Sequence, residues 1–181
     1  MYQQSNTKQI VIGVDPGIHT GYAVLAVTNS LVVLECLLKL SGDRTLIAKQ
    51  ILEATEKFKC STKELRIYVE EANIRGSASM KKHGAFVNRV YGEYIHGFLA
   101  GHGYSVTMIT PMRWKGNTPK SVKAGKLLDR YTVQRFVPPN DLEKLRAGKK
   151  SRWEDPVDAL GIADYGVRFP VNVLDSKRIP A

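Results

Sequence analysis

The sequence predicts an α/β protein in which a mixed, five-stranded sheet carries helices on both faces. Three apolar, β-branched segments follow one another near the start of the chain, and from there on segments of strand and helix character alternate. Strands that alternate with helices favour a sheet covered on both sides. Because 181 residues suit one domain with a substantial core, we expect a single domain over 1–181 with the element order βββαβαβα.

The first three strands form a predicted antiparallel meander. Residues 9–15, 22–28 and 31–38 are rich in Val, Leu and Ile, and only short turns separate them. A Ser-Gly-Asp turn follows, and residues 44–59 then carry apolar side chains at helical spacing. The chain is therefore expected to leave the sheet through a first helix.

The second half of the sheet is predicted from two further apolar segments. Strands are expected over 66–71 and 104–109, with a helix over 81–101 between them. A last helix is expected from Asp155 to about Arg168. This helix closes the fold after a long intervening segment of different composition.

That intervening segment, at about 111–152, reads as a basic insertion in the domain. It holds 12 Lys or Arg against 3 Asp or Glu, within a chain of net charge +10 and pI about 9.6. One helix is expected inside it, over 120–135. A charge asymmetry of this size favours a polyanionic partner, most plausibly nucleic acid, and the alternative is a merely soluble basic surface.

Other function classes are disfavoured by what the sequence lacks. Cys36 and Cys60 stand in separate segments without a CxxC pattern, so neither a disulfide framework nor a zinc site is expected. The first residues contain no apolar signal core, and no apolar run reaches 18 residues. We expect a soluble, unprocessed protein of the reducing cytoplasm.

Four carboxylates stand where secondary structure would bring them together: Asp15, Glu70, Asp155 and Asp158. Asp15 and Glu70 each end an apolar strand. Asp155 and Asp158 are three residues apart at the start of the last helix, so both lie on one helical face. If the chain folds these ends together, it forms an acidic site.

Four acids without a Cys or His ligand set favour Mg²⁺, with Mn²⁺ as a substitute, over zinc. Two such cations about 4 Å apart promote phosphodiester hydrolysis, one by activating water and the other by stabilising the leaving oxygen. In this scheme Asp15 bridges two ions, Glu70 holds one, and Asp155 and Asp158 hold the other.

Each acid also has a simpler interpretation. Asp15 before Pro-Gly could be an ordinary turn residue. Asp155 could cap the last helix, with Asp158 as the acid of a capping box. Glu71 competes with Glu70, and strand alternation lets only one of them face Asp15; we choose Glu70.

Three motifs resemble those of the RuvC family of Holliday-junction resolvases, in the same order along the chain. They are Ile12-Gly13-Val14-Asp15-Pro16-Gly17, closed by Thr20-Gly21-Tyr22; Val69-Glu70-Glu71; and Asp155-Pro156-Val157-Asp158-Ala159-Leu160-Gly161-Ile162-Ala163. The resemblance implies an RNase H-like fold, a homodimer, and magnesium-dependent cutting of opposed strands at four-way junction DNA during recombination and repair. It further implies 5′-phosphate and 3′-hydroxyl ends and branch-migration machinery as a partner.

The sequence also departs from the family. The aromatic that commonly follows the second acid by three residues is Asn73 here, and the loop after Gly17 is one residue shorter than usual. These differences suggest a divergent branch, phage or organellar, so an organelle or a phage-infected host cell is an alternative location.

Among the basic residues, Lys120 is predicted to stabilise charge on the cleaved phosphate, and Lys115 is its rival. The residues expected to bind DNA are Arg75, Lys81, Lys82, Arg113, Lys115, Lys120 and Lys123. Trp114 and Trp153 flank the basic insertion and could stack on a base or anchor the core.

An apolar stripe on the helix predicted at 81–101 has two interpretations: core packing, or pairing with its copy across a two-fold axis. It comprises Phe86, Val90, Tyr94, Ile95 and Phe98. Two other functions also compete with junction resolution: an RNase H-like nuclease that acts on hybrids, flaps or other branched DNA, and a catalytically silent junction-binding protein.

Overall fold

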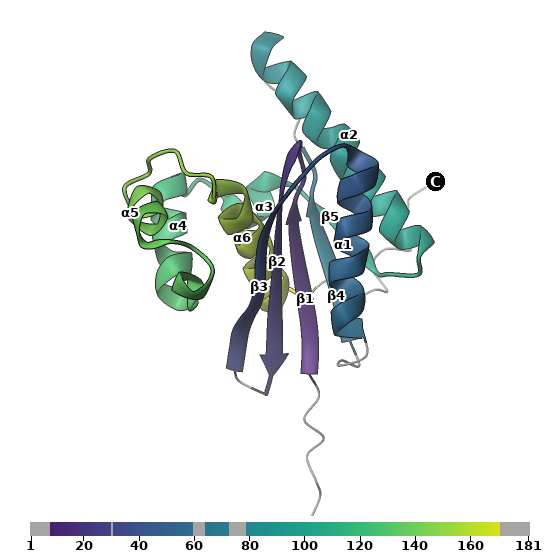
Figure 1. Cartoon of the computed structure of the whole chain (residues 1–181), viewed down its shortest axis with the longest axis horizontal. Helices are drawn as coiled ribbons and strands as arrows, with labels where there is room; N and C mark the ends of the chain where they lie inside the picture. Colours follow the sequence, from purple (N-terminus) through teal and green to yellow (C-terminus); the bar gives the residue numbers. More distant parts are fainter. Residues whose placement is uncertain (1–7, 30, 60–63, 73–78, 171–181) are drawn as a thin grey trace, which may run out of the picture.

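The computed structural model describes residues 8–29, 31–59, 64–72 and 79–170 (Figure 1). Its centre is a five-stranded mixed sheet in the order β3-β2-β1-β4-β5. The strands are β1 Lys8–Asp15, β2 His19–Thr28, β3 Leu31–Ser41, β4 Glu64–Glu70 and β5 Val106–Ile109. β1, β2 and β3 form the predicted antiparallel meander, whereas β4 lies parallel to both β1 and β5. The predicted sheet is confirmed.

Helices cover both faces of the sheet, as predicted. α1 (Arg44–Lys59) and α2 (Ser79–Gly101) lie on one face, and α6 (Glu154–Arg168) lies on the other (Figure 1). The basic segment adds α3 (Pro111–Lys115), α4 (Lys120–Arg130) and α5 (Pro139–Arg146) to the α6 side. Among the described residues, no helix is both long and apolar enough to cross a membrane.

Strand alternation divides the core into two layers. Ile10, Ile12 and Val14 of β1 pack in the cluster that includes α1 and α2 residues. Val11, between them in sequence, packs with α6 on the opposite face. A sheet buried on both sides therefore explains why β1 reads as a continuous apolar run rather than an alternating one.

The basic segment differs from its prediction. The helix expected over 120–135 ends at Arg130, because Tyr131 is extended (φ −115°, ψ 148°), and only a 3₁₀ turn, Val133–Arg135, follows. The helices α3 and α5 were not predicted. Each has a proline as its first residue. In the sequence these prolines looked like breaks, but proline is also favoured at the first position of a helix.

Candidate active site

The ends of β1 and β4 place Asp15 beside Glu70. The two strands are parallel and pair Val14 with Val69, so the next residues stand at neighbouring strand ends. Tyr68 and Val11 both pack on the α6 face, and alternation puts Glu70 and Asp15 on that same face. Glu71 follows the strand and is exposed. Of the two adjacent acids, Glu70 is therefore the one that accompanies Asp15.

Two glycines let the start of α6 lie directly on these strand ends. A Cβ at Gly21 would lie 1.9 Å from the carbonyl oxygen of Asp155, and one at Gly13 would lie 2.1 Å from that of Ala159. Gly21 is also the residue that pairs with Asp15 across β1 and β2. This close backbone approach brings Asp155 and Asp158 to the acidic strand ends.

The capping interpretation of the two helix acids is wrong. Trp153 stands at the N-cap position of α6 and makes no side-chain cap, while Glu154 and Asp155 lie in the first turn. Asp155 is therefore already inside the helix, and Asp158 is buried one turn further on, 8% exposed. A buried carboxylate at this position is stabilised by a charge partner, and Lys115 lies 3.3 Å from Asp158 Oδ2.

The four acids form a like-charge cluster. Burial raises the pKa of Asp15 well above its ordinary value, and the charges of Glu70, Asp158 and Asp155 raise it further. Asp15 as a whole residue is partly buried, and it lines a cleft at the end of β1. Burial also raises the pKa of Glu70, against the opposing effect of Lys115. Raised pKa values at neighbouring acids indicate a site that favours a bound cation.

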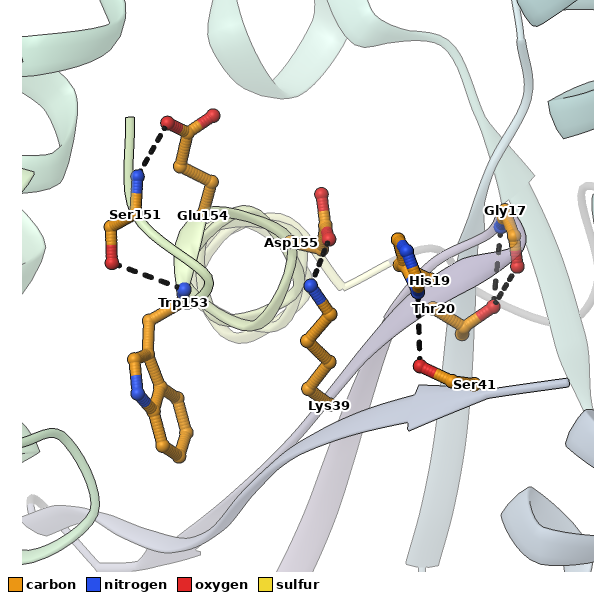
Figure 2. A network of polar contacts seen from close by, with 9 residues as sticks. All are labelled: Gly17, His19, Thr20, Lys39, Ser41, Ser151, Trp153, Glu154 and Asp155. Carbon is orange, nitrogen blue, oxygen red and sulfur yellow. Dashed lines mark hydrogen bonds and ion pairs between the residues drawn. The ribbon is translucent and has the colours of Figure 1, made fainter. Parts of the chain in front are cut away.

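Two lysines partly neutralise the cluster. The Nζ atom of Lys115 lies 3.6 Å from Glu70 Oε2 and 3.3 Å from Asp158 Oδ2. Lys39 Nζ lies 3.6 Å from Asp155 Oδ2 (Figure 2). Burial lowers the pKa of Lys115, but Asp158, Glu70 and Asp15 together raise it above its ordinary value. Lys115 therefore stands as a cation among the acids.

Hydrogen bonds hold the β1–β2 turn and the start of α6 in place (Figure 2). The Thr20 hydroxyl donates to the Gly17 carbonyl over 2.7 Å, and the Gly17 amide donates back to it over 3.2 Å. Near α6, the Ser151 amide donates to Glu154 over 3.1 Å. Asp15 and Asp155 line one cleft, which the β1–β2 turn and α2 border.

The donor set fits a hard divalent cation, but it is not preassembled around one. Carboxylate oxygens are the ligands that Mg²⁺ and Mn²⁺ prefer. Within the part of the chain that the structure describes, no three acidic, His or Cys side chains are close enough together to hold an ion. Trp114 Nε1 donates to Glu70 Oε2 over 2.6 Å, and Lys115 stands between Glu70 and Asp158. A metal would require Glu70 and Lys115 to move.

The predicted basic residues have different outcomes. Lys115 lies among the acids, whereas Lys120 begins α4 and its side chain lies outside the described residues. Arg113 is exposed, and Lys123 donates to the backbone carbonyl of Trp114. Arg75 and the side chains of Lys81 and Lys82 lie outside the described residues.

One residue of the site, Lys39, was missed in the sequence, and the structure decides between the two roles left open for Trp114. Lys39 interrupts the apolar run of β3, and this charge in a strand was the available signal. Trp114 is 4% exposed and packs against Gly161, so it anchors the core and is not free to stack on a base. Trp153 is partly buried and packs against the same core cluster.

The fold is that of RNase H-like nucleases. Thermus thermophilus RuvC matches with a TM-score of 0.57 at 20% identity, over 88% of this chain and 96% of that chain. The same protein in complex with a Holliday junction substrate matches with a TM-score of 0.55 at 19% identity, over 88% and 96%. The expected RNase H-like fold is confirmed.

Two further solved structures share the architecture at lower identity. The yeast mitochondrial Holliday junction resolvase Ydc2 matches with a TM-score of 0.51 at 12% identity, over 92% of this chain and 81% of that chain. The human cytomegalovirus terminase nuclease domain, which was soaked with Mn, matches with a TM-score of 0.50 at 13% identity, over 92% and 88%. No known protein-family profile matches the chain, and no curated protein matches it in sequence.

Proposed function

We propose that this protein is a structure-selective DNA endonuclease that resolves Holliday junctions by metal-dependent phosphodiester hydrolysis. The supporting observation is the gathering of Asp15, Glu70, Asp155 and Asp158 at one edge of a RuvC-like sheet. The products are nicks with 5′-phosphate and 3′-hydroxyl ends, and the working form is a homodimer with one site per subunit.

The carboxylates would hold two Mg²⁺ ions, or Mn²⁺ in their place. When bound, this pair supplies a hydroxide nucleophile and stabilises the leaving oxygen. Asp15, at the centre of the charge cluster, would contact both ions, with Glu70 on one side and Asp155 and Asp158 on the other. Lys39 orients Asp155 through their ion pair. Lys115 supplies positive charge at the place where the scissile phosphate meets the acids.

The basic surface supports DNA as the substrate. The segment at 111–152 carries most of the excess charge and packs beside α6, next to the acidic cluster. Cations flanking an acidic, metal-binding site attract the DNA backbone and hold it over the acids. A catalytically silent protein has no need to retain four acids on three elements.

The decisive variant is Asp15→Asn. It removes the most strongly perturbed carboxylate while keeping its shape, so we expect cleavage of a four-way junction in Mg²⁺ to be lost. Junction binding, measured by fluorescence anisotropy, should stay within about threefold of the wild type, since phosphate contacts dominate affinity. Glu71→Gln, at the exposed neighbour of Glu70, is the matched control and should cut normally. Normal cutting by the Asp15 variant would remove the assignment.

A substrate panel separates the proposal from its alternatives. Four-way junction, plain duplex, flap and RNA–DNA hybrid are compared at equal concentration in Mg²⁺. We expect the junction to be cut at opposed strands and plain duplex to be left intact. Preferential cutting of a hybrid or flap would support metal-dependent hydrolysis but show that the substrate is not the four-way junction. Junction binding without any cutting would identify a catalytically silent binding protein.

A further inference from the structure

A second pocket lies beside the candidate active site, between α3, α4 and α6. Its lining includes Lys115, Lys123, Lys126, Arg130, Arg168 and the single acid Asp164. Trp114, Thr118 and Leu127 are its remaining lining residues. We call this hollow the basic pocket. Lys115 belongs to both places, because its ammonium also contacts Glu70 and Asp158.

The acid in the basic pocket is already fully engaged. Asp164 is 2% exposed; its Oδ1 accepts from Arg130 Nη1 over 2.6 Å and from the Tyr131 hydroxyl over 2.8 Å. Its Oδ2 lies 2.7 Å from Arg168 Nη2. One carboxylate therefore holds two guanidinium groups. Lys115 is paired with Glu70 and Asp158 outside the pocket, and the other four basic residues exceed Asp164 by three positive charges.

The lysines of the pocket show this excess. Lys123 is partly buried, and its ammonium lies 4.0 Å from the centre of the Trp114 ring. Burial, together with the charges of Lys115 and Arg168, lowers the pKa of Lys123 to about 8. Lys126 is exposed and makes no hydrogen bond or ion pair with any other described residue. Mutual repulsion of this kind is relieved when an anion enters.

We infer that the basic pocket binds one backbone phosphodiester of the DNA strand that crosses the active site, at a position away from the cut. This rests on the proposed function in taking DNA as the ligand. Lys115 makes the pocket continuous with the acidic cluster, so a strand with its scissile phosphate at the acids can place a neighbouring phosphate here. Arg130 and Arg168, oriented by Asp164, and the free ammonium of Lys126 would be its donors.

The test uses Lys126→Gln in the full-length Asp15→Asn protein, where cleavage does not interfere with binding. Lys126 has no structural partner among the described residues, so its loss leaves the fold intact. Lys49→Gln is the matched control, an exposed lysine on α1 across the sheet, and Lys126→Arg retains the charge. Affinity for a four-way junction is measured by anisotropy over a salt series, and phosphate contacts are mapped by ethylation interference.

We expect Lys126→Gln to reduce the slope of log affinity against log salt by about 1, and affinity near physiological salt by about threefold to tenfold. One ethylation-sensitive phosphate should disappear from the map, and Lys126→Arg should restore it. Slope and map equal to those of the Lys49→Gln control would overturn the inference. Cleavage by the otherwise wild-type protein is measured in parallel, so absent cutting with an altered slope rejects only the proposed function.

A free phosphate ion is the other source of the same chemistry. Thermal stability of the wild type and of Lys126→Gln is therefore compared with and without inorganic phosphate, at constant ionic strength. Equal stabilisation of both proteins, with an altered DNA salt slope, supports the backbone phosphate. Stabilisation of the wild type alone, with an unchanged DNA salt slope, would replace the DNA strand with a free phosphate and overturn the inference.

Discussion

At the scale of single residues, the site is defined by charges that the fold forces together. Asp15 stands at a strand end with three acids around it, and Lys115 compensates them only in part. Such a carboxyl holds its proton more tightly in the folded chain than in the unfolded one. Stability from this group is therefore present at pH below the ordinary carboxyl range and is lost as pH rises through the raised pKa.

Asp15→Asn should consequently stabilise the metal-free protein near neutral pH, because it removes a carboxyl whose raised pKa lowers stability at a pH where the unfolded chain leaves that carboxyl ionised. We expect the free energy of unfolding to rise by about 1 kcal/mol and the melting temperature by roughly 2–4 °C. Calorimetry in chelator should show that the gain shrinks as pH falls into the ordinary carboxyl range. Glu71→Gln, at an exposed acid, should change the melting temperature little. A less stable Asp15 variant at neutral pH would contradict this account.

The two candidate lysines can also be separated residue by residue. Lys115 contacts Glu70 and Asp158. Lys120 is the first residue of α4, and its side chain lies outside the described residues. We expect Lys115→Met to slow single-turnover junction cleavage by about 100-fold, the usual cost of one transition-state charge partner. Lys120→Met should weaken junction binding by less than about tenfold and leave the cleavage rate of bound junction near normal. The reverse ranking would restore Lys120 to the role first predicted for it.

At the scale of elements, the strands were predictable and the helices of the basic segment were not. Apolar runs ending in acids identify β1 and β4, because a strand buried on both faces needs continuous apolar side chains. Short helices such as α3 carry no period long enough to detect, and their prolines looked like breaks. Alternation showed that only one of Glu70 and Glu71 could face Asp15. Deciding between them, and placing Lys39, required the strand pairing, which tertiary contacts set.

The acidic cluster depends on how closely α6 approaches the sheet. Gly13→Ala would place a Cβ 2.1 Å from the Ala159 carbonyl and 2.6 Å from the Ala163 amide, and backbone atoms cannot move aside as a side chain can. We expect a loss of about 3 kcal/mol in unfolding free energy, together with weaker Mn²⁺ binding by calorimetry. The control is Gly97→Ala in α2, where nothing lies within 4 Å of the new Cβ. Helix propensity predicts that this change stabilises by up to about 1 kcal/mol.

At the scale of the whole molecule, only the second half of α2 packs into the core. Ile95 and Leu99 are fully buried against the sheet, whereas Phe86 is 57% exposed. The first turns of α2 extend past the end of the sheet (Figure 1). The apolar stripe therefore splits: its later positions pack within the domain, and its earlier positions remain available to a second copy of the chain.

We expect the protein to form a dimer through this part of α2, with a mass by light scattering of about twice the 20.2 kDa chain. Phe86→Glu should shift the protein toward monomer. A two-fold interface contains the changed residue twice, so dimerisation would bury two new negative charges. Phe169→Glu is the matched control for Phe86→Glu. Phe169 is exposed to a similar extent, 55%, but it lies at the far end of α6, so this variant should remain a dimer. A wild-type monomer would leave paired cutting of opposed strands without a mechanism. If the Phe86 variant becomes monomeric, it should still nick one strand and lose coordinated cutting of the second, because each acidic cluster is built within one chain.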